Sequence, residues 1–165
     1  MPPYEFTNGG DCTTVRLCVS PWSGTVSRGQ DSMADIGRDH CRVLIIEDDP
    51  DSSDSLREAL ELDGHEIAVA LNATEGLSKA RELHPDVVVC DIGLPDSDGY
   101  AVAQTLRADK SLENACLVAI SGYGRPDDMK RASQAGFTHH FTKPISLEAV
   151  QLLLRELSTR GSVTP

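Results

Sequence analysis

From residue 42 onward, the chain alternates between short apolar runs and longer segments whose apolar residues recur at helical spacing. The short runs predict five strands, at residues 43–46, 67–70, 87–89, 117–120 and 137–142. The segments that follow them predict five helices, of which the last is the most regular, with Val150, Leu153, Leu154 and Leu157 on one face. Strands and helices that alternate one by one form a parallel sheet covered by helices on both faces.

Residues that start and stop helices support this assignment. Asp49 followed by Pro50 is typical of a helix start, and so is Asn72 with Glu75 three residues later. Gly136 is typical of a helix stop. Right-handed crossovers leave few topologies for five parallel strands. We therefore predict an α/β fold, namely a flavodoxin-like, doubly wound sheet of five parallel strands in the order 2-1-3-4-5 with five helices.

The first 40 residues differ from the rest of the chain. They are rich in Pro, Gly, Ser and Thr, and their one apolar patch, residues 15–22, is too short to bury much surface. We divide the chain into a disordered N-terminal extension (1–40), one folded domain (41–158) and a C-terminal tail (159–165). Met33 lies just ahead of the first strand, so residues 1–32 are either an upstream extension or the product of a misassigned start.

The charge of the chain narrows the functions open to it. Of the net charge of -11, residues 41–165 carry -9, from 21 acids and 12 bases. Such an acidic domain disfavours direct nucleic-acid binding and suits a divalent cation or a basic partner, unless the acidity serves only solubility. No run approaches the roughly 18 apolar residues of a membrane span, and the N-terminus has no signal-peptide pattern. We expect a cytoplasmic protein with no membrane insertion.

The five cysteines do not predict a disulfide framework or a zinc site, because their number is odd and their spacings match no zinc template. Cys41, Cys90 and Cys116 lie at or beside predicted strands, where cysteine behaves as a small buried apolar residue. We interpret all five as reduced thiols.

Polar residues follow four of the five predicted strands. Glu47 and Asp48 follow the first strand, Asp91 the third, Ser121 the fourth and Lys143 the fifth. The second strand, which we expect at the edge of the sheet, contributes none. Because the carboxyl ends of parallel strands meet at one edge of a sheet, these side chains are expected to lie together.

The residue types in this set indicate phosphoryl-transfer chemistry. Clustered carboxylates repel one another, and a Mg²⁺ ion with its preference for oxygen ligands relieves that repulsion. One carboxylate then serves as a nucleophile toward phosphorus and forms an acyl phosphate. A lysine ammonium and a serine hydroxyl stabilise the charge on the phosphoryl oxygens.

With these residues in place, the sequence resembles the receiver domain of bacterial two-component response regulators, the CheY-like family, over residues 42–157. The resemblance rests on four motifs, at residues 44–50 (LIIEDDP), 87–99 (VVVCDIGLPDSDG), 118–122 (VAISG) and 141–144 (FTKP). Each motif alone is weak to moderate evidence. All four together, in this order and at these separations, are highly specific.

The resemblance implies a role for each acidic position. Asp91 matches the phosphoacceptor of the family. Glu47 and Asp48 match the acidic pair that holds Mg²⁺, with Asp48 as the direct ligand. Gly93 matches the position whose backbone carbonyl binds the metal.

Ser121 matches the hydroxyl that binds the phosphoryl group, and Lys143 matches the lysine that pairs with it. One position departs from the family, because His140 stands where an activation switch has Tyr or Phe. We expect Ser121 and His140 to form the switch, with the signal also read through residues 122–128. His139 and His140 should not chelate one ion, because neighbours on a strand point to opposite faces.

The resemblance implies a signalling phosphoacceptor rather than an enzyme, with only self-catalysed phosphotransfer and slow autodephosphorylation. Its phosphodonor would be a histidine kinase or a hybrid kinase, and residues 121–124 and 135–137 are more similar to hybrid-kinase receivers. Two alternatives stay open. A phosphatase of the haloacid-dehalogenase type needs a second acid where Gly93 stands. A degenerate receiver that only binds a partner would have lost one of the acids, for example Asp91, or would have lost Lys143.

Overall fold

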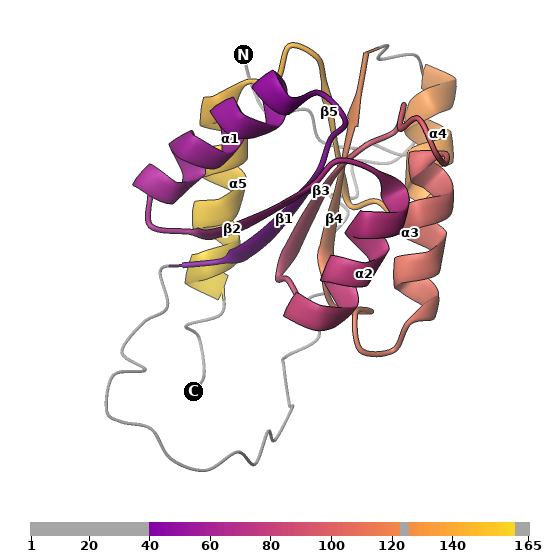
Figure 1. Cartoon of the computed structure of the whole chain (residues 1–165), viewed down its shortest axis with the longest axis horizontal. Coiled ribbons are helices and arrows are strands. Elements are labelled where there is room, and N and C mark those ends of the chain that lie inside the picture. The colour runs from indigo at the N-terminus through magenta and orange to yellow at the C-terminus, as the bar shows by residue number, and fades with distance from the viewer. Residues whose placement is uncertain (1–39, 123–125, 161–165) are drawn as a thin grey trace, which may run out of the picture.

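The structure, a computed structural model, describes residues 40–122 and 126–160, in which strands and helices alternate along the chain (Figure 1). The strands are β1 (Arg42–Ile46), β2 (Glu66–Ala70), β3 (Val87–Asp91), β4 (Cys116–Ser121) and β5 (His139–Thr142). The helices are α1 (Pro50–Leu62), α2 (Ala73–Leu83), α3 (Gly99–Ala108), α4 (Pro126–Ala135) and α5 (Leu147–Arg160). The expected extension and tail, with Met33, lie almost wholly outside these residues and stay predictions.

The five strands form one sheet in the order β2-β1-β3-β4-β5, and every pair of neighbours is parallel. The predicted flavodoxin-like fold is therefore confirmed. The register pairs Ile46 of β1 with Cys90 of β3, and Asp91 of β3 with Ile120 of β4. The carboxyl ends of β1, β3 and β4 thus lie side by side.

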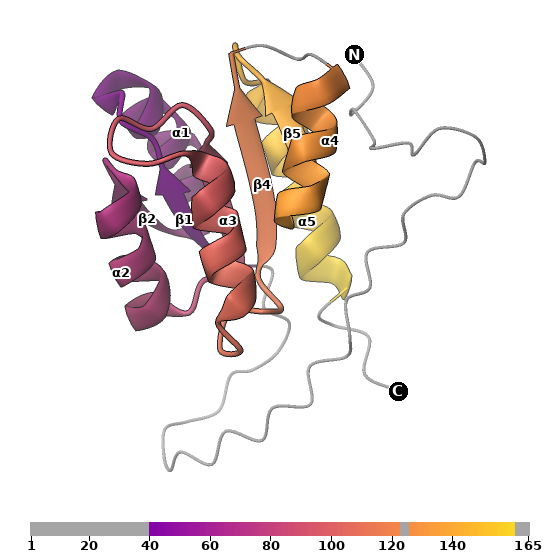
Figure 2. The same cartoon turned by 90° about the vertical axis from the view of Figure 1, so that its right-hand side faces the viewer.

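Two apolar layers hold the helices against the sheet, and alternate residues of each strand enter opposite layers. Leu44 and Ile46 belong to the apolar cluster that α2, α3 and α4 cover. These three helices lie in front of the sheet in Figure 2. Val43 and Ile45 belong to the cluster under α1 and α5 on the other face. β3 is buried along its whole length, as expected of a central parallel strand.

The helix ends follow the predicted signals. Asp49 caps α1 by accepting a hydrogen bond from the Ser52 backbone N–H at 3.1 Å, and Asn72 caps α2 in the same way. Gly136 follows α4 with a φ of +106°, a backbone conformation that favours glycine.

The fifth strand is shorter than predicted, because it begins at His139 rather than at Phe137. The backbone N–H of Phe137 donates instead to the carbonyl of Ala132 at 3.0 Å, so Phe137 completes the turn that ends α4.

The three cysteines that the structure describes, Cys41, Cys90 and Cys116, are unpaired and buried, as predicted. Cys12 and Cys18 lie outside the described residues. Among the helices of the described ranges, none has the length and apolarity needed to cross a membrane.

Candidate functional site

Three carboxylates meet at the carboxyl edge of the sheet. Glu47 and Asp48 directly follow β1, and Asp91 is the last residue of the neighbouring strand β3. One oxygen from each side chain lies within 4.8 Å of the others. Glu47 and Asp91 are 2% and 6% exposed, whereas Asp48 is open to solvent. The sheet therefore gathers the three acids that the sequence singled out.

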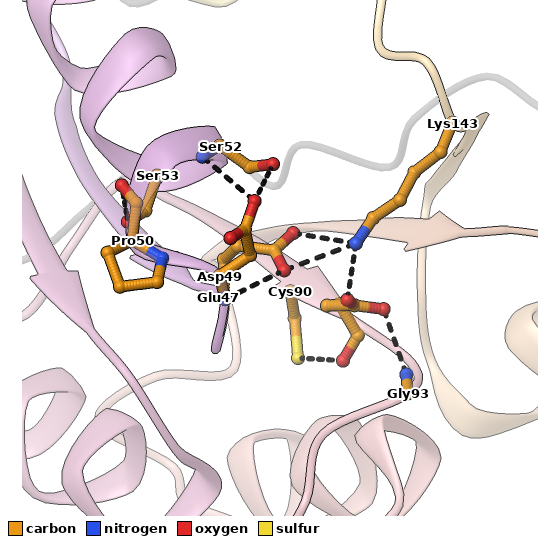
Figure 3. A network of polar contacts seen from close by, with 9 residues as sticks. Glu47, Asp49, Pro50, Ser52, Ser53, Cys90, Gly93 and Lys143 are labelled. Atoms are coloured by element: carbon orange, nitrogen blue, oxygen red, sulfur yellow. Dashed lines mark hydrogen bonds and ion pairs between the residues drawn. The ribbon is translucent and has the colours of Figure 1, made fainter.

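Lys143 completes this cluster from the end of β5. Its Nζ lies 2.7 Å from Asp91 Oδ2 and 3.1 Å from Glu47 Oε1, so the side chain reaches past the end of β4 (Figure 3). Burial alone would lower the pKa of Lys143, but the hydrogen bonds to Asp91 and Glu47 outweigh it and raise that pKa. The ammonium is thus held in its charged form between two buried carboxylates.

Glu47 carries the clearest sign that the cluster fits a cation. Burial is the main cause that raises the pKa of Glu47, the Asp91 charge adds to it, and the hydrogen bond from Lys143 opposes it. Among the described residues, Glu47 Oε2 has no hydrogen-bond partner, although Lys143 Nζ lies 3.0 Å away as an ion pair. One ammonium against three carboxylates leaves an excess of negative charge. Oxygen ligands with unused lone pairs in this arrangement fit Mg²⁺.

The loop after β3 is folded tightly around Asp91. The backbone N–H of Gly93 donates to Asp91 Oδ1 at 2.9 Å, which orients the carboxylate (Figure 3). The backbone N–H of Gly99 donates to the carbonyl of Ile92 at 3.0 Å and closes the loop. A Cβ at Gly99 would lie 2.5 Å from the Asp91 carbonyl oxygen, so only glycine allows this approach.

Ser121, the last residue of β4, lies at the same edge, and its hydroxyl contacts a histidine. Ser121 Oγ is 2.7 Å from His140 Nε2, and the two residues are 7% and 3% exposed. Burial lowers the pKa of His140, against a smaller opposing effect of Asp128. His140 is therefore already packed inward, in contact with the residue that the sequence paired with it.

His139 faces the other way. Its Nδ1 lies 3.2 Å from Thr138 Oγ1 and 3.7 Å from Cys116 Sγ, on the sheet face covered by α1 and α5. The two neighbouring histidines thus have separate surroundings, as predicted from their places on one strand.

Sequence reasoning missed one long-range contact of the site. Asp96 in the β3–α3 loop is not among the residues that the sequence singled out, but its carboxylate accepts hydrogen bonds from the backbone of Ala73 and Thr74 at the start of α2. No local pattern reveals this contact, because its partners lie 22 and 23 residues away in the sequence. Residues 123–125, in the loop expected to carry the signal, are outside the described ranges.

The fold and the site together define a class of protein. It is a doubly wound domain with an acidic cluster and a buried hydroxyl at the carboxyl ends of its central strands, and a lysine at the end of the edge strand β5. Residues 43–155 match the response regulator receiver domain. The chain therefore belongs to the response regulator receiver domain family, the CheY-like domains of two-component signalling.

Curated relatives share about a third of their residues with this chain. A protein described as an uncharacterized 14.6 kDa protein of Leptolyngbya boryana is 35% identical over 112 residues, which are 67% of this chain and 86% of that protein. The polar-differentiation response regulator DivK of Brucella ovis is 32% identical over 64% of this chain and 85% of its own. The match to the DNA-binding transcriptional regulator RpaA of Synechocystis is 32% identical and spans only 52% of that protein.

Solved structures support the same fold. A CheY-like receiver domain protein from Methanospirillum hungatei is 27% identical with a TM-score of 0.65, over 73% of this chain and 98% of that one. The chemotaxis response regulator CheY4 of Vibrio cholerae has a TM-score of 0.67 at 20% identity, over 72% of this chain and 98% of that one. At this identity, the second match supports the fold alone.

Proposed function

We propose that this domain is a signalling phosphoacceptor that receives a phosphoryl group on Asp91. The observation that carries the proposal is the setting of the Asp91 carboxylate. One oxygen accepts a hydrogen bond from the Gly93 N–H and the other from Lys143, beside the buried carboxylate of Glu47. In the reaction, a carboxylate oxygen bonds to phosphorus while the donor's bond to phosphorus breaks, and the donor group leaves with the electron pair of that bond.

Glu47, Asp48, Asp91 and the backbone carbonyl of Gly93 would hold a Mg²⁺ ion. The ion would supply positive charge against the carboxylates and the phosphoryl oxygens. The buried Glu47 Oε2, which has an ion pair with Lys143 but no hydrogen-bond partner among the described residues, and the excess of negative charge in the cluster support this assignment. Asp48, exposed at the rim, is the member of the set that a metal can reach without rearrangement of the core.

Lys143 and Ser121 would hold the transferred group from the other side. Lys143 supplies a fixed ammonium to the phosphoryl oxygens, and the hydroxyl of Ser121 supplies a hydrogen bond. Ser121 and His140 would form the switch, because the hydroxyl must turn from His140 toward the phosphoryl group when Asp91 is modified. Transfer of the signal to residues 122–128, which follow Ser121 in the chain, is part of the same proposal.

The family indicates the kind of partner. Receiver domains accept phosphate from histidine kinases, so we assign the phosphodonor to a histidine kinase or hybrid kinase. The phosphorylated domain would then act through a protein partner in the cytoplasm. The acidic composition of residues 41–165 argues against direct contact with nucleic acid.

Incubation with Mg²⁺ and acetyl phosphate or phosphoramidate tests the proposal, with intact-mass measurement of the product. The wild type should gain the mass of one phosphoryl group, and Asp91→Asn should gain none. Asp51→Asn is the matched control, because Asp51 is an exposed acid in the first turn of α1. An adduct that survives Asp91→Asn, or no adduct on the wild type, contradicts the proposal.

A further inference from the structure

We propose that Asp96 is a positioning residue for the metal site, which rests on the function proposed above. The Asp96 carboxylate leaves the β3–α3 loop and reaches the first turn of α2. Its Oδ1 accepts from the Ala73 N–H at 2.8 Å. Its Oδ2 accepts from the Thr74 N–H at 3.1 Å and from the Thr74 hydroxyl at 3.0 Å. We call this set of three hydrogen bonds the Asp96 clip.

The clip is an addition to an already capped helix. The side chain of Asn72 accepts from the N–H of Glu75 at 2.8 Å, and its carbonyl accepts from the N–H of Gly76 at 3.0 Å. A helix start leaves four N–H groups without partners inside the helix. The Asn72 side chain satisfies the N–H of Glu75, and Asp96 satisfies those of Ala73 and Thr74, whereas the bond from Gly76 to the Asn72 carbonyl is the first bond within the helix. Capping a helix does not by itself require a residue from another part of the chain. Besides capping α2, the Asp96 clip therefore attaches the β3–α3 loop to this helix.

Helix α2 is itself fixed to the strand that carries the acidic pair. A Cβ at Gly76 would lie 2.5 Å from Ile46 Cδ1, so the helix backbone packs directly on the last residue of β1. Glu47 comes next in the chain, and its backbone N–H donates to the carbonyl of Ala70 at 3.0 Å, at the end of β2. The start of α2 and the backbone of Glu47 thus belong to one rigid unit.

The other end of the clip lies three residues after Gly93. Leu94, between Gly93 and Asp96, is buried in the core, and Gly93 is bonded through its N–H to Asp91. The segment from Asp91 to Asp96 is therefore held at both ends. One half of the proposed metal site, Glu47 with Asp48, lies on the unit of β1 and α2. The other half consists of Asp91, the last residue of β3, and the Gly93 carbonyl, which lies in the clipped loop.

The pairing of β1 with β3 places Asp91 beside Glu47, and the Asp96 clip fixes the position of the Gly93 carbonyl relative to these carboxylates. Ligands around Mg²⁺ require near-ideal octahedral geometry, so a loop free to shift would weaken binding. Asp96 lies outside the ligand set, and its carboxylate is held in its charged form because the backbone N–H groups of Ala73 and Thr74 lower its pKa. It acts on the ion only through the position of the loop.

Titration of the full chain with MgCl₂ by isothermal calorimetry tests this role. We expect Asp96→Ala to raise the Mg²⁺ dissociation constant about tenfold, the lower end of outer-shell effects, with Asp96→Asn in between. Asn72→Ala is the matched control, because it removes the other acceptor at the same helix end and leaves the loop attached. It should change Mg²⁺ affinity by less than about twofold.

A second readout does not need the ion. Hydrogen exchange of the metal-free protein should become faster at the Gly93 amide in Asp96→Ala and stay unchanged there in Asn72→Ala, as the loop loses its anchor. Asp96→Asn repeats the comparison if the alanine variant does not fold. Equal Mg²⁺ affinity in wild type and Asp96→Ala, or an equal loss in Asn72→Ala, overturns the positioning role alone. A wild type that binds no Mg²⁺ overturns the proposed function as well.

Discussion

Ser121 Oγ and His140 Nε2 lie 2.7 Å apart in the interior of the domain. The residue that would hold the phosphoryl group is therefore already bonded to the residue that stands where the family has an aromatic switch. An imidazole both fills space and exchanges a hydrogen bond, and it changes charge near neutral pH. The first prediction follows from that change of charge.

Acid should destabilise the domain through His140. Burial lowers the pKa of His140 below its ordinary value of 6.5, so between these two values the unfolded chain binds more protons than the folded chain. Stability contributed by neutral His140 is present above about pH 6.5 and is lost as the pH falls toward the folded pKa. Urea unfolding between about pH 7.5 and 5.5 should show this slope, and His140→Phe should reduce it.

Ser121→Ala separates the hydrogen bond from the titration. Ser121→Ala removes the hydrogen bond between Ser121 and His140 but leaves the imidazole in place. It should lower the free energy of unfolding by about 1 kcal/mol and keep most of the dependence of stability on pH. A His140→Phe variant with the full wild-type slope would show that other groups cause it. His65 is the next candidate, because burial also lowers its pKa.

Lys143→Gln should destabilise the metal-free domain more at pH 7 than at pH 5. The substitution leaves Glu47 and Asp91 without their cation, and Lys143 is about one-third exposed, so we expect a loss of about 1 kcal/mol at pH 7. The loss should shrink at lower pH, because Glu47, whose folded pKa is raised, takes up a proton.

Lys79→Gln provides the control for that experiment. Lys79 is exposed to a similar extent, 35% against 34%, but its partners are the surface acid Glu75 and the backbone carbonyl of Val69. Its removal should cost the same at both pH values, because neither partner is a buried acid. Equal losses in the two variants, measured by thermal unfolding at the two pH values, would be inconsistent with a buried site at Glu47.

Mg²⁺ should stabilise the folded chain by mass action. At about 100 times its dissociation constant, the ion should raise the free energy of unfolding by about 2.7 kcal/mol. Asp48→Asn should remove most of this gain, whereas Asp51→Asn should keep it. Thermal unfolding with and without MgCl₂, at constant ionic strength, makes the comparison. A gain that persists in Asp48→Asn would exclude Asp48 as a ligand.

Gly99→Ala should impair phosphorylation although the substitution adds only a methyl group. The new Cβ would lie 2.5 Å from the Asp91 carbonyl oxygen and 2.6 Å from Ile92 Cα, both of which are backbone atoms. We expect a loss of about 1–3 kcal/mol in stability from overpacking. Displacement of Asp91 should slow phosphorylation by about tenfold or more, since small misplacements of reacting groups cost this much.

Gly122→Ala is the control, because a Cβ there would have no neighbour within 4 Å among the residues that the structure describes. It should be phosphorylated by acetyl phosphate at close to the wild-type rate, as measured by intact mass over time. Comparable slowing in both variants would mean that steric contact with Asp91 is not the cause.

The sheet and the site were predictable because they follow from local patterns. The apolar runs fix the strands, and the strand ends place Glu47, Asp91, Ser121 and Lys143 at one edge. The caps at Asp49 and Asn72 were also predictable, since each bonds to a residue three positions away.

The remaining features depend on contacts that are distant in the sequence. The strand β5 starts late because Phe137 bonds back into the turn that ends α4, which an apolar run does not reveal. The partners of Asp96 lie in the first turn of α2, 22 and 23 residues away in the sequence, so no local pattern reveals the contact. The inward placement of His140 depends on the packing between β4 and β5, and its residue type alone does not determine that placement.

Localisation of the phosphoryl group tests the central claim most directly. The chain is phosphorylated with acetyl phosphate and Mg²⁺, reduced with borohydride, and mapped by peptide mass spectrometry, because reduction of an aspartyl phosphate leaves homoserine at the modified position. We predict homoserine at position 91 and at no other aspartate. Homoserine at Asp48 or at another acid, with Asp91 unmodified, would contradict the account.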